Sequence, residues 1–205
     1  MFSLFSGHDR VAGSLPSKPQ WYHFRVICSG YVLVGGRSTR MGRDKASLPF
    51  RGSTLSASIA REVALAAGSA TLVGDPAKGI PDLYPGEGPL GGILTALAHT
   101  TADWNLIVAC DMPCAGASLF RRLLEAARQS DADALVPLGP AGFPEPLCAV
   151  YHRRARPAIE ARFAAGTRKI TAALEGLAVV WLETTETACF QNVNTPEEWA
   201  AHGGK

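Results

Sequence analysis

Residues 31–45, YVLVGGRSTRMGRDK, combine a strand pattern with a glycine-rich basic loop. The first four residues, which include Leu33 and Val34, are aromatic or aliphatic and predict a buried strand. Gly35 and Gly36 follow, and the loop after them contains three arginines and a lysine. Adjacent glycines let a ligand approach the backbone closely, and successive exposed N–H groups form a concavity that binds anions. The pattern therefore predicts a loop that wraps a polyphosphate at the carboxyl end of a strand.

Two widespread phosphate loops do not fit this spacing. A Walker A loop has four residues between its first glycine and the Gly-Lys-Ser/Thr triplet, whereas five residues separate Gly36 from Gly42. The dinucleotide fingerprint G-x-G-x-x-G is absent because Gly35 and Gly36 are adjacent. The alternative is a basic surface loop without a ligand, but the strand, the glycine pair and the cations occur together, which favours phosphate binding.

The composition predicts one globular domain. The chain has 205 residues, of which 47% are hydrophobic, so it can form a sizeable core. Its net charge of +2 is too small to favour nucleic acid as a partner. No apolar run approaches the roughly 18 residues of a membrane span, so no membrane insertion is expected. Five cysteines, mostly in apolar segments, predict reduced, buried thiols and a cytoplasmic protein.

Strand and helix patterns alternate after the glycine loop without an internal repeat. Thr54 or Ser53 is expected to cap a helix that runs to about Ala67. The alternation predicts an α/β fold in three layers, with a mostly parallel twisted sheet, helices on both faces and a short antiparallel edge. Residues 1–28 lack any periodic pattern and are expected to form an N-terminal extension, either disordered or an artefact of an early start codon.

Asp111 follows the continuous apolar run WNLIVAC at residues 104–110, which is typical of a central parallel strand. A carboxylate at the carboxyl end of a central strand lies where α/β sheets bind ligands, and its oxygens suit Mg²⁺. A turn or helix N-cap is the alternative for such an aspartate. A phosphate loop elsewhere in the chain favours the metal, so Asp111 is the predicted magnesium ligand.

Two further segments have features of a ligand site. Residues 88–92, GPLGG, precede a predicted helix whose first N–H groups are available to a ligand, although such clusters are usually turns. Residues 192–197, NVNTPE, place Asn192 and Asn194 two residues apart on an extended segment, so their side chains point the same way.

Together these segments resemble the molybdenum cofactor guanylyltransferases. In chain order the matching segments are LVGGRSTRMGRDK, GPLGG, DMP, EPLCAVY and NVNTPE. The resemblance implies a Rossmann-like, glycosyltransferase-A-like nucleotidyltransferase domain at residues 29–205. It implies transfer of GMP from GTP to the terminal phosphate of molybdopterin, with pyrophosphate as the second product. It also implies Mg²⁺ as cofactor and transient contacts with other proteins of molybdenum cofactor synthesis.

The resemblance also assigns roles to residues. Lys45 and Arg40 are expected to stabilise charge on the α-phosphate and the leaving pyrophosphate, while Asp111 holds Mg²⁺. No nucleophilic side chain is needed because the acceptor phosphate is already an anion, so catalysis consists of positioning and charge stabilisation. The expected nucleotide-binding residues are Leu33, Val34, Gly35, Gly36, Lys45, Asp82, Gly88, Pro89, Leu90, Asn192 and Asn194.

Two markers favour guanine over cytosine. The related cytidylyltransferases usually have A-A-G and D-Q-P where this chain has Val34-Gly35-Gly36 and Asp111-Met-Pro. The additional glycine, Gly35, leaves room for a purine. Asp75 and Asp82 are both candidates to accept hydrogen bonds from the guanine edge, with no choice between them.

The acceptor side leaves alternatives open. Glu145 is either a ligand of a substrate amine or pterin edge or a surface residue. Arg168 and Lys169 either bind the acceptor phosphate or are solvated charges. The alternatives to the function are a cytidylyltransferase or other sugar-phosphate-type nucleotidyltransferase, and a non-catalytic nucleotide-binding protein.

Overall fold

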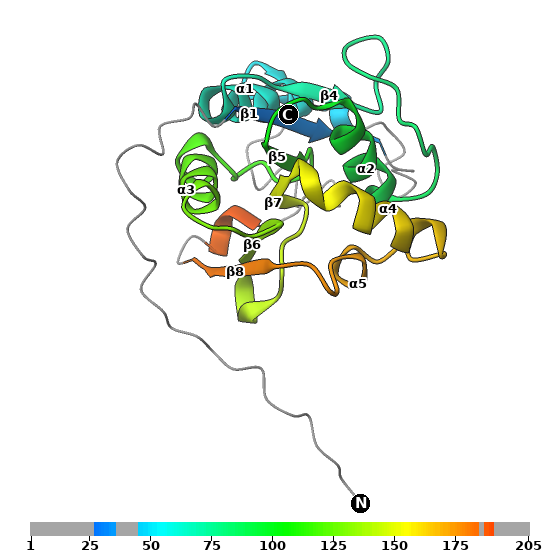
Figure 1. The fold of residues 1–205 in the computed structure, drawn as a ribbon. Helices are drawn as coiled ribbons and strands as arrows, with labels where there is room; N and C mark the ends of the chain where they lie inside the picture. The colour runs from blue at the N-terminus through cyan, green and yellow to red at the C-terminus, as the bar shows by residue number, and fades with distance from the viewer. Residues whose placement is uncertain (1–26, 36–44, 185–186, 191–205) are drawn as a thin grey trace, which may run out of the picture.

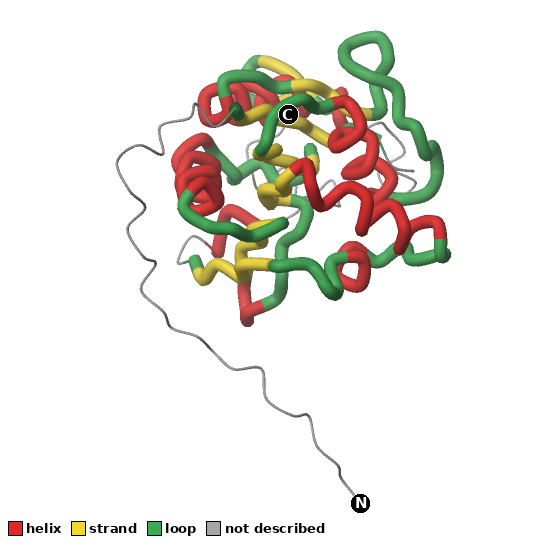
Figure 2. The backbone as a smooth tube through the Cα atoms, in the orientation of Figure 1, coloured by secondary structure: helices red, strands yellow, loops and turns green. Residues whose placement is uncertain are grey.

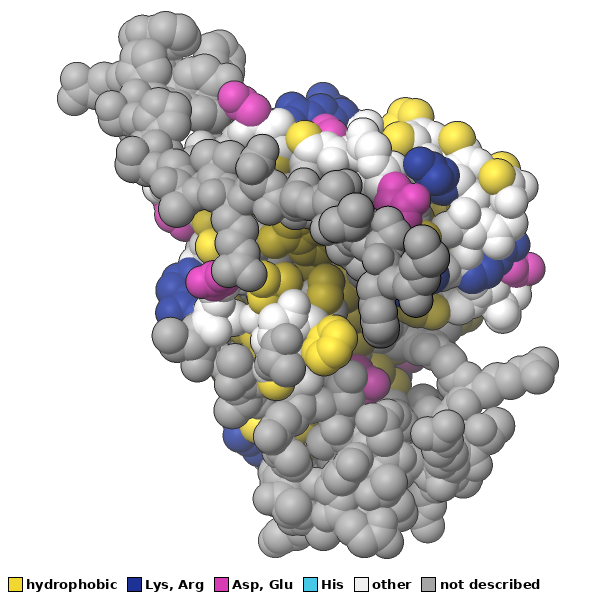
Figure 3. All heavy atoms as spheres, turned by 90° about the horizontal axis from the view of Figure 1, so that it is seen from below, with side chains coloured by type: hydrophobic (Ala, Val, Ile, Leu, Met, Phe, Trp, Pro, Cys, Tyr) yellow, Lys and Arg dark blue, Asp and Glu magenta, His cyan; other side chains and the backbone are white. Residues whose placement is uncertain are grey.

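The computed structural model of the chain describes residues 27–35, 45–184 and 187–190 (Figure 1). The expected N-terminal extension therefore lies almost entirely outside the described residues, and the first strand begins at Cys28. None of the described helices combines the length and the apolar character needed to cross a membrane. On the face seen in Figure 3, the described cationic and anionic side chains are dispersed and form no large patch of one sign.

Six strands form the central sheet in the order β4-β1-β5-β7-β6-β8. Figure 2 draws the strands in yellow. Their bounds are β1 (Cys28–Leu33), β4 (Thr71–Val73), β5 (Trp104–Ala109), β6 (Ala134–Leu138), β7 (Cys148–His152) and β8 (Val179–Glu183). β1 pairs in parallel with β4 and β5, and β6 pairs in parallel with β8. The mostly parallel sheet predicted from the sequence is confirmed.

The position predicted for the antiparallel strand is wrong. β7 runs antiparallel to both β5 and β6 and lies inside the sheet, not at its edge. Its first four residues, Cys148 to Tyr151, are fully buried, as an interior strand requires. An apolar sequence indicates burial on both faces but does not specify which strands lie beside it. Two short strands, β2 (Pro49–Phe50) and β3 (Ser53–Thr54), form a separate antiparallel pair.

Helices cover both faces of the sheet, as predicted (Figure 1). α1 (Leu55–Ala67) and α3 (Ala117–Arg128) pack on one face, and α2 (Pro89–His99), α4 (Arg156–Ala164) and α5 (Ile170–Ala173) pack on the other. The short 3-10 helices are η1 (Lys45–Ser47), η2 (Pro140–Gly142), η3 (Arg153–Ala155) and η4 (Thr187–Phe190). The sheet thus separates two hydrophobic cores, one under each helical layer.

Local sequence accounts for the helix boundaries. Thr54 is the N-cap of α1, and its hydroxyl accepts a hydrogen bond from the Ala57 N–H at 3.3 Å, so the prediction of this cap is confirmed. Gly68 ends the same helix in the left-handed conformation. α2 is apolar on most sides because it lies between the sheet and α4.

α3 obtains its N-terminal cap from another helix. Its N-cap residue is Gly116, which has no side chain to accept a hydrogen bond. The carboxylate of Glu62, on α1, accepts the Ala117 N–H at 2.9 Å instead. A negative charge at this end also interacts favourably with the helix dipole. The contact therefore ties α1 to α3 across one helical layer.

We expect Glu62→Ala to lower the free energy of unfolding by about 1 kcal/mol, because the first turn of α3 loses its acceptor. Urea denaturation checks this. The matched control is Glu125→Ala, which removes an exposed carboxylate 3.6 Å from Arg128 in the same helix and should cost less than about 0.5 kcal/mol. Equal losses in the two variants would contradict a capping role for Glu62.

Candidate active site

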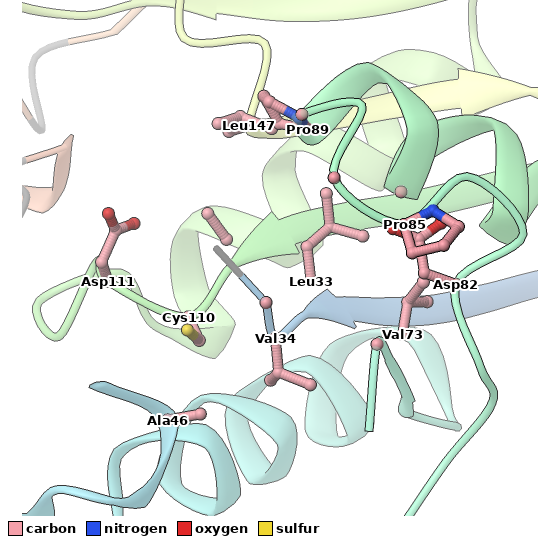
Figure 4. A pocket seen from close by; sticks show the side chains of 16 residues that line it. Leu33, Val34, Ala46, Val73, Asp82, Pro85, Pro89, Cys110, Asp111 and Leu147 are labelled. Carbon is pink, nitrogen blue, oxygen red and sulfur yellow. The ribbon is translucent and has the colours of Figure 1, made fainter. Parts of the chain in front are cut away.

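A cavity of about 970 Å³ lies at the carboxyl ends of β1, β4 and β5 (Figure 4). Parallel strands of an α/β sheet commonly bind ligands at this edge. The lining residues come from strand ends, from the loop before α2 and from the start of α2. They are Leu33, Val34, Gly35, Ala46, Val73, Gly74, Asp82, Pro85, Gly86, Gly88, Pro89, Gly92, Ala109, Cys110, Asp111 and Leu147.

The end of β1 provides an open stretch of backbone. Val34 donates its N–H to the Val73 carbonyl at 2.9 Å, which keeps the end of β1 beside the end of β4. A Cβ added at Gly74 would overlap the Val34 carbonyl oxygen, so only glycine fits there. Gly35 has φ +155°, and a Cβ added to it would meet no atom of the described residues within 4 Å. Relative to these residues, the backbone at Gly35 therefore faces the open part of the cavity.

Two carboxylates lie on opposite sides of the end of β1 (Figure 4). Asp111 lies two residues beyond the end of β5 and is half-buried. The N–H of its neighbour Cys110 donates to the Leu33 carbonyl at 3.2 Å, which aligns the two strand ends. Asp82 lines the other side, before α2. The structure therefore places both predicted aspartates at the cavity.

Asp82 is held in place by α2. Its Oδ1 accepts the Thr95 hydroxyl at 2.8 Å and the Tyr84 N–H at 3.0 Å. Within the described residues, no hydrogen bond to its Oδ2 is found. Asp75 is different, because its carboxylate turns toward its own loop, where Oδ2 lies 3.7 Å from the Lys78 ammonium, and it does not line the cavity. Of the two candidates for the guanine edge, Asp82 is the one that lines the cavity.

The first turn of α2 forms part of the wall. Gly88, Pro89 and Gly92 line the cavity, and a Cβ added at Gly92 would lie 3.2 Å from Leu33 Cδ2, so the helix approaches β1 closely. Leu90 does not line it, since its side chain is fully buried in the core between α2 and the sheet. Since the Leu90 side chain is in the core, a ligand could contact this residue only through its backbone. The GPLGG pattern did not separate these two faces of the helix.

Several predicted residues lie outside the described part of the chain. Gly36 and Arg40 belong to the loop at residues 36–44, and Asn192 and Asn194 belong to residues 191–205. Lys45 begins η1, and its backbone is described but its side chain is not. The roles assigned to these five residues stay predictions.

Sequence reasoning missed several small and apolar residues of the wall. They are Ala46, Val73, Pro85, Gly86, Ala109, Cys110 and Leu147. Two of them could have been predicted from the rule that ligands bind at the carboxyl ends of parallel strands, because Val73 and Ala109 are the last residues of such strands. Leu147 could not be found in this way, since it precedes the antiparallel strand β7.

The residues considered for the acceptor side do not line the cavity. Burial raises the pKa of the Glu145 carboxyl above its ordinary value, and this side chain packs against Gly139. Arg168 donates from Nε to Glu87 Oε2 at 2.7 Å, while Lys169 is exposed. The structure thus gives Arg168 a protein partner that the sequence did not indicate.

The donor set at the cavity suits magnesium. In the part of the chain that the structure describes, no three His, Cys, Asp or Glu side chains come together as a metal cage. A structural zinc site needs about four such ligands. Mg²⁺ binds through one or two carboxylates together with substrate phosphates and water, and the half-buried Asp111 carboxylate fits that pattern.

Comparisons with known proteins agree with this geometry. Residues 30–179 match the model of the MobA-like NTP transferase domain. A molybdenum cofactor guanylyltransferase from Pseudomonas putida is 34% identical over 191 residues, which cover 84% of this chain and 96% of that protein. Another from Vibrio atlanticus is 30% identical and covers 92% of this chain and 97% of that protein.

Solved structures show the same fold. Molybdopterin-guanine dinucleotide biosynthesis protein A from Archaeoglobus fulgidus superposes with a TM-score of 0.73 at 28% identity, covering 85% of this chain and 96% of that chain. The 2-C-methyl-D-erythritol 4-phosphate cytidylyltransferase from Thermus thermophilus superposes with a TM-score of 0.62 at 17% identity, covering 84% and 96%. The second likeness concerns the fold alone.

We expect Gly74→Ala to destabilise the protein by about 1–3 kcal/mol more than Gly52→Ala, because only the former forces a methyl group against the Val34 carbonyl. Both glycines have positive φ, and a Cβ at Gly52 would meet no atom of the described part of the chain within 4 Å, so the control carries a similar backbone strain without the overlap. Thermal or urea unfolding measures the difference. Equal destabilisation would contradict the close approach of β4 to the end of β1.

Proposed function

The chain belongs to the molybdenum cofactor guanylyltransferases of the MobA-like NTP transferase family, and from this membership we propose how its cavity works. The protein is a nucleotidyltransferase that transfers GMP from GTP to the terminal phosphate of molybdopterin. The products are the guanine dinucleotide form of the cofactor and pyrophosphate. GTP and molybdopterin are therefore its two substrates.

The observation that carries the proposal is the convergence of three features at one cavity. The glycine end of β1, the aspartate after β5 and the first turn of α2 all line it. Its volume of about 970 Å³ lies near the upper end of ordinary ligand pockets, which run to roughly 1,000 Å³, so it suits two sizeable substrates.

The base is assigned to the side of the cavity formed by Asp82. One oxygen of this carboxylate is fixed by Thr95 of α2, and the other is assigned to the ligand because the residue lines the cavity. The guanine edge offers N–H donors at N1 and N2, and the remaining oxygen of the Asp82 carboxylate has two lone pairs with which to accept them. Gly35 leaves space for a purine because this residue itself projects no side chain into the cavity.

The phosphates are assigned to the side of the cavity formed by Asp111. Mg²⁺ held by Asp111 would stabilise negative charge on the nucleotide phosphates. The backbone at Gly35 faces the same space and offers close approach to an anion. We keep Lys45 and Arg40 as predicted charge-stabilising residues, and Asn192 and Asn194 as predicted phosphate contacts.

The transfer needs positioning rather than a protein nucleophile. An oxygen of the acceptor phosphate forms a bond to the α-phosphorus of GTP, and the bond from that phosphorus to pyrophosphate breaks. No proton has to be removed from an ionised phosphate before it attacks. The residues of the cavity therefore contribute by aligning two anions and by offsetting their charge.

We also propose a cytoplasmic location and transient contacts with other proteins of molybdenum cofactor synthesis. A reducing compartment is supported by the cysteines, since all five lie among the described residues and none of them forms a disulfide. The contacts would allow a reactive acceptor to pass between enzymes without release.

We expect the protein to release pyrophosphate from GTP when Mg²⁺ and molybdopterin are present, with kcat/KM for GTP exceeding that for CTP by roughly tenfold or more. The physical reason is that the Asp82 carboxylate and the space at Gly35 suit guanine. A coupled pyrophosphate assay with each nucleotide provides the measurement. Faster turnover of CTP would favour a cytidylyltransferase, and GTP binding without turnover with any nucleotide would favour a non-catalytic binding protein.

We expect Asp111→Ala to lower kcat at least about a hundredfold, the size of effect seen when a charge-stabilising group is removed from an active site. The thermal midpoint should change little, because the side chain lies at the cavity wall. Asp103→Ala is the matched control, since Asp103 precedes the opposite end of β5 and pairs with Arg153 on the surface. Turnover in Asp111→Ala comparable to that of Asp103→Ala would disprove the assignment of the metal to Asp111.

A further inference from the structure

The loop at residues 81–88 forms one wall of the cavity, but most of it lies at the surface. Asp82, Pro85, Gly86 and Gly88 line the cavity, and the two glycines contribute no side chain that could brace the loop. Asp82 secures its first part through α2. The second part makes its side-chain contacts through Tyr84 and Glu87, which do not line the cavity.

Tyr84 anchors the middle of the loop on α4. Its ring packs against Phe163, with centroids 4.8 Å apart and an interplanar angle of 60°. Its hydroxyl donates to Glu160 Oε1 at 3.3 Å. Burial and the neighbouring Glu160 carboxylate raise the pKa of the Tyr84 hydroxyl, so it stays protonated and remains a donor at neutral pH.

Glu87 anchors the end of the loop on the segment between α4 and α5. Its Oε2 accepts a hydrogen bond from Arg168 Nε at 2.7 Å, which is a charge-assisted contact. The Glu87 N–H donates to the Tyr84 carbonyl at 3.1 Å, so the two anchors are also joined to each other. Glu87 immediately precedes Gly88, the N-cap of α2.

Arg168 is itself fixed before it contacts the loop. One of its terminal nitrogens donates to the Phe163 carbonyl at 2.8 Å and to the Thr167 carbonyl at 3.0 Å. Its guanidinium carbon lies 4.0 Å from the centre of the Phe163 ring. These contacts place the cation at the carboxyl end of α4, where the helix dipole favours positive charge. Arg168 therefore presents its Nε to Glu87 from a preorganised position.

We propose that Arg168 is a positioning residue for the nucleotide side of the active site, acting through Glu87 on the loop at residues 81–88. It holds the wall formed by Gly86 and Gly88 in the shape that accepts the nucleoside, and it does not bind the acceptor phosphate. The inference rests on the proposed function, because it concerns the site to which GTP is assigned. It links the loop before α2 to the α4–α5 segment, 81 residues further along the chain.

The hydrogen bonds that Arg168 already donates to protein acceptors distinguish this role from phosphate binding. Its Nε and one terminal nitrogen already donate to protein acceptors. The residue does not line the cavity, whereas residues on both sides of Glu87 do. An exposed ion pair contributes little to global stability, so the effect is expected in the affinity for nucleotide rather than in unfolding.

The test compares Arg168→Ala, Glu87→Ala and the double variant for GTP and acceptor kinetics, for equilibrium GTP binding and for thermal stability. Each single variant should raise the KM and Kd for GTP roughly threefold to fivefold, the upper end of what an exposed pair contributes. The double variant should bind GTP no more weakly than the single variant with the lower GTP affinity, because both changes break the same contact. The KM for the acceptor and kcat should stay within about twofold.

Arg162→Ala is the matched control. Arg162 lies on α4 and pairs at 3.8 Å with Glu175, and among the described residues it makes no ion pair or hydrogen bond to the loop. Its GTP affinity should equal that of the unchanged protein. The proposal is overturned if Arg168→Ala and Arg162→Ala have the same GTP affinity, or if the two single effects add in the double variant. A rise in acceptor KM in Arg168→Ala but not in Glu87→Ala would assign Arg168 to the acceptor phosphate.

Hydrogen exchange separates this inference from the proposed function. Amides of residues 82–92 should exchange faster in Arg168→Ala and Glu87→Ala than in Arg162→Ala, with no nucleotide present. Faster exchange together with absence of GTP binding by the unchanged protein would contradict the proposed function and leave the contact between Arg168 and the loop supported. Unchanged exchange in all three variants would overturn the positioning role whatever nucleotide the protein uses.

Discussion

The parallel register of three strands is the constraint on which the active site depends. Leu33 on β1 pairs with Val73 on β4 and with Ala109 on β5, so the three strands end at the same level. Hydrogen bonds from Val34 to β4 and from Cys110 to β1 continue this alignment one residue beyond the strands. At this edge of the sheet the accessible backbone of Gly35 and the carboxylate of Asp111 therefore line the same cavity, although the two residues are far apart in sequence.

The antiparallel strand β7 extends the same edge instead of interrupting it. Because β7 runs against its neighbours, its amino end lies where their carboxyl ends lie, which brings Leu147 to the cavity. The Ala109 N–H donates to the Leu147 carbonyl at 2.8 Å. Ala109 lies two residues before Asp111 in the chain, so this contact holds Leu147 close to Asp111. The residue that precedes an interior antiparallel strand thus becomes part of the wall of the site.

Polar contacts, together with the packing of the Tyr84 ring on Phe163, determine the shape of the wall before α2. Thr95 is buried among apolar residues of α2, yet its hydroxyl joins both Asp82 and the Leu83 N–H. Hydrogen bonds are directional, so they fix a loop at one orientation where a hydrophobic contact would tolerate several. This explains how a segment rich in glycine and proline can present a defined surface to a ligand.

Local sequence determined the strands, the helices, the Thr54 cap and the placement of Asp111 after a central strand, because each depends on residues within a few positions of one another. The tertiary structure decided what depends on distant residues. It placed β7 inside the sheet, turned Asp75 away from the cavity that Asp82 lines, and paired Arg168 with Glu87. Periodicity reports which side of an element is buried, whereas neighbours across the sheet and between loops are chosen by packing of the whole chain.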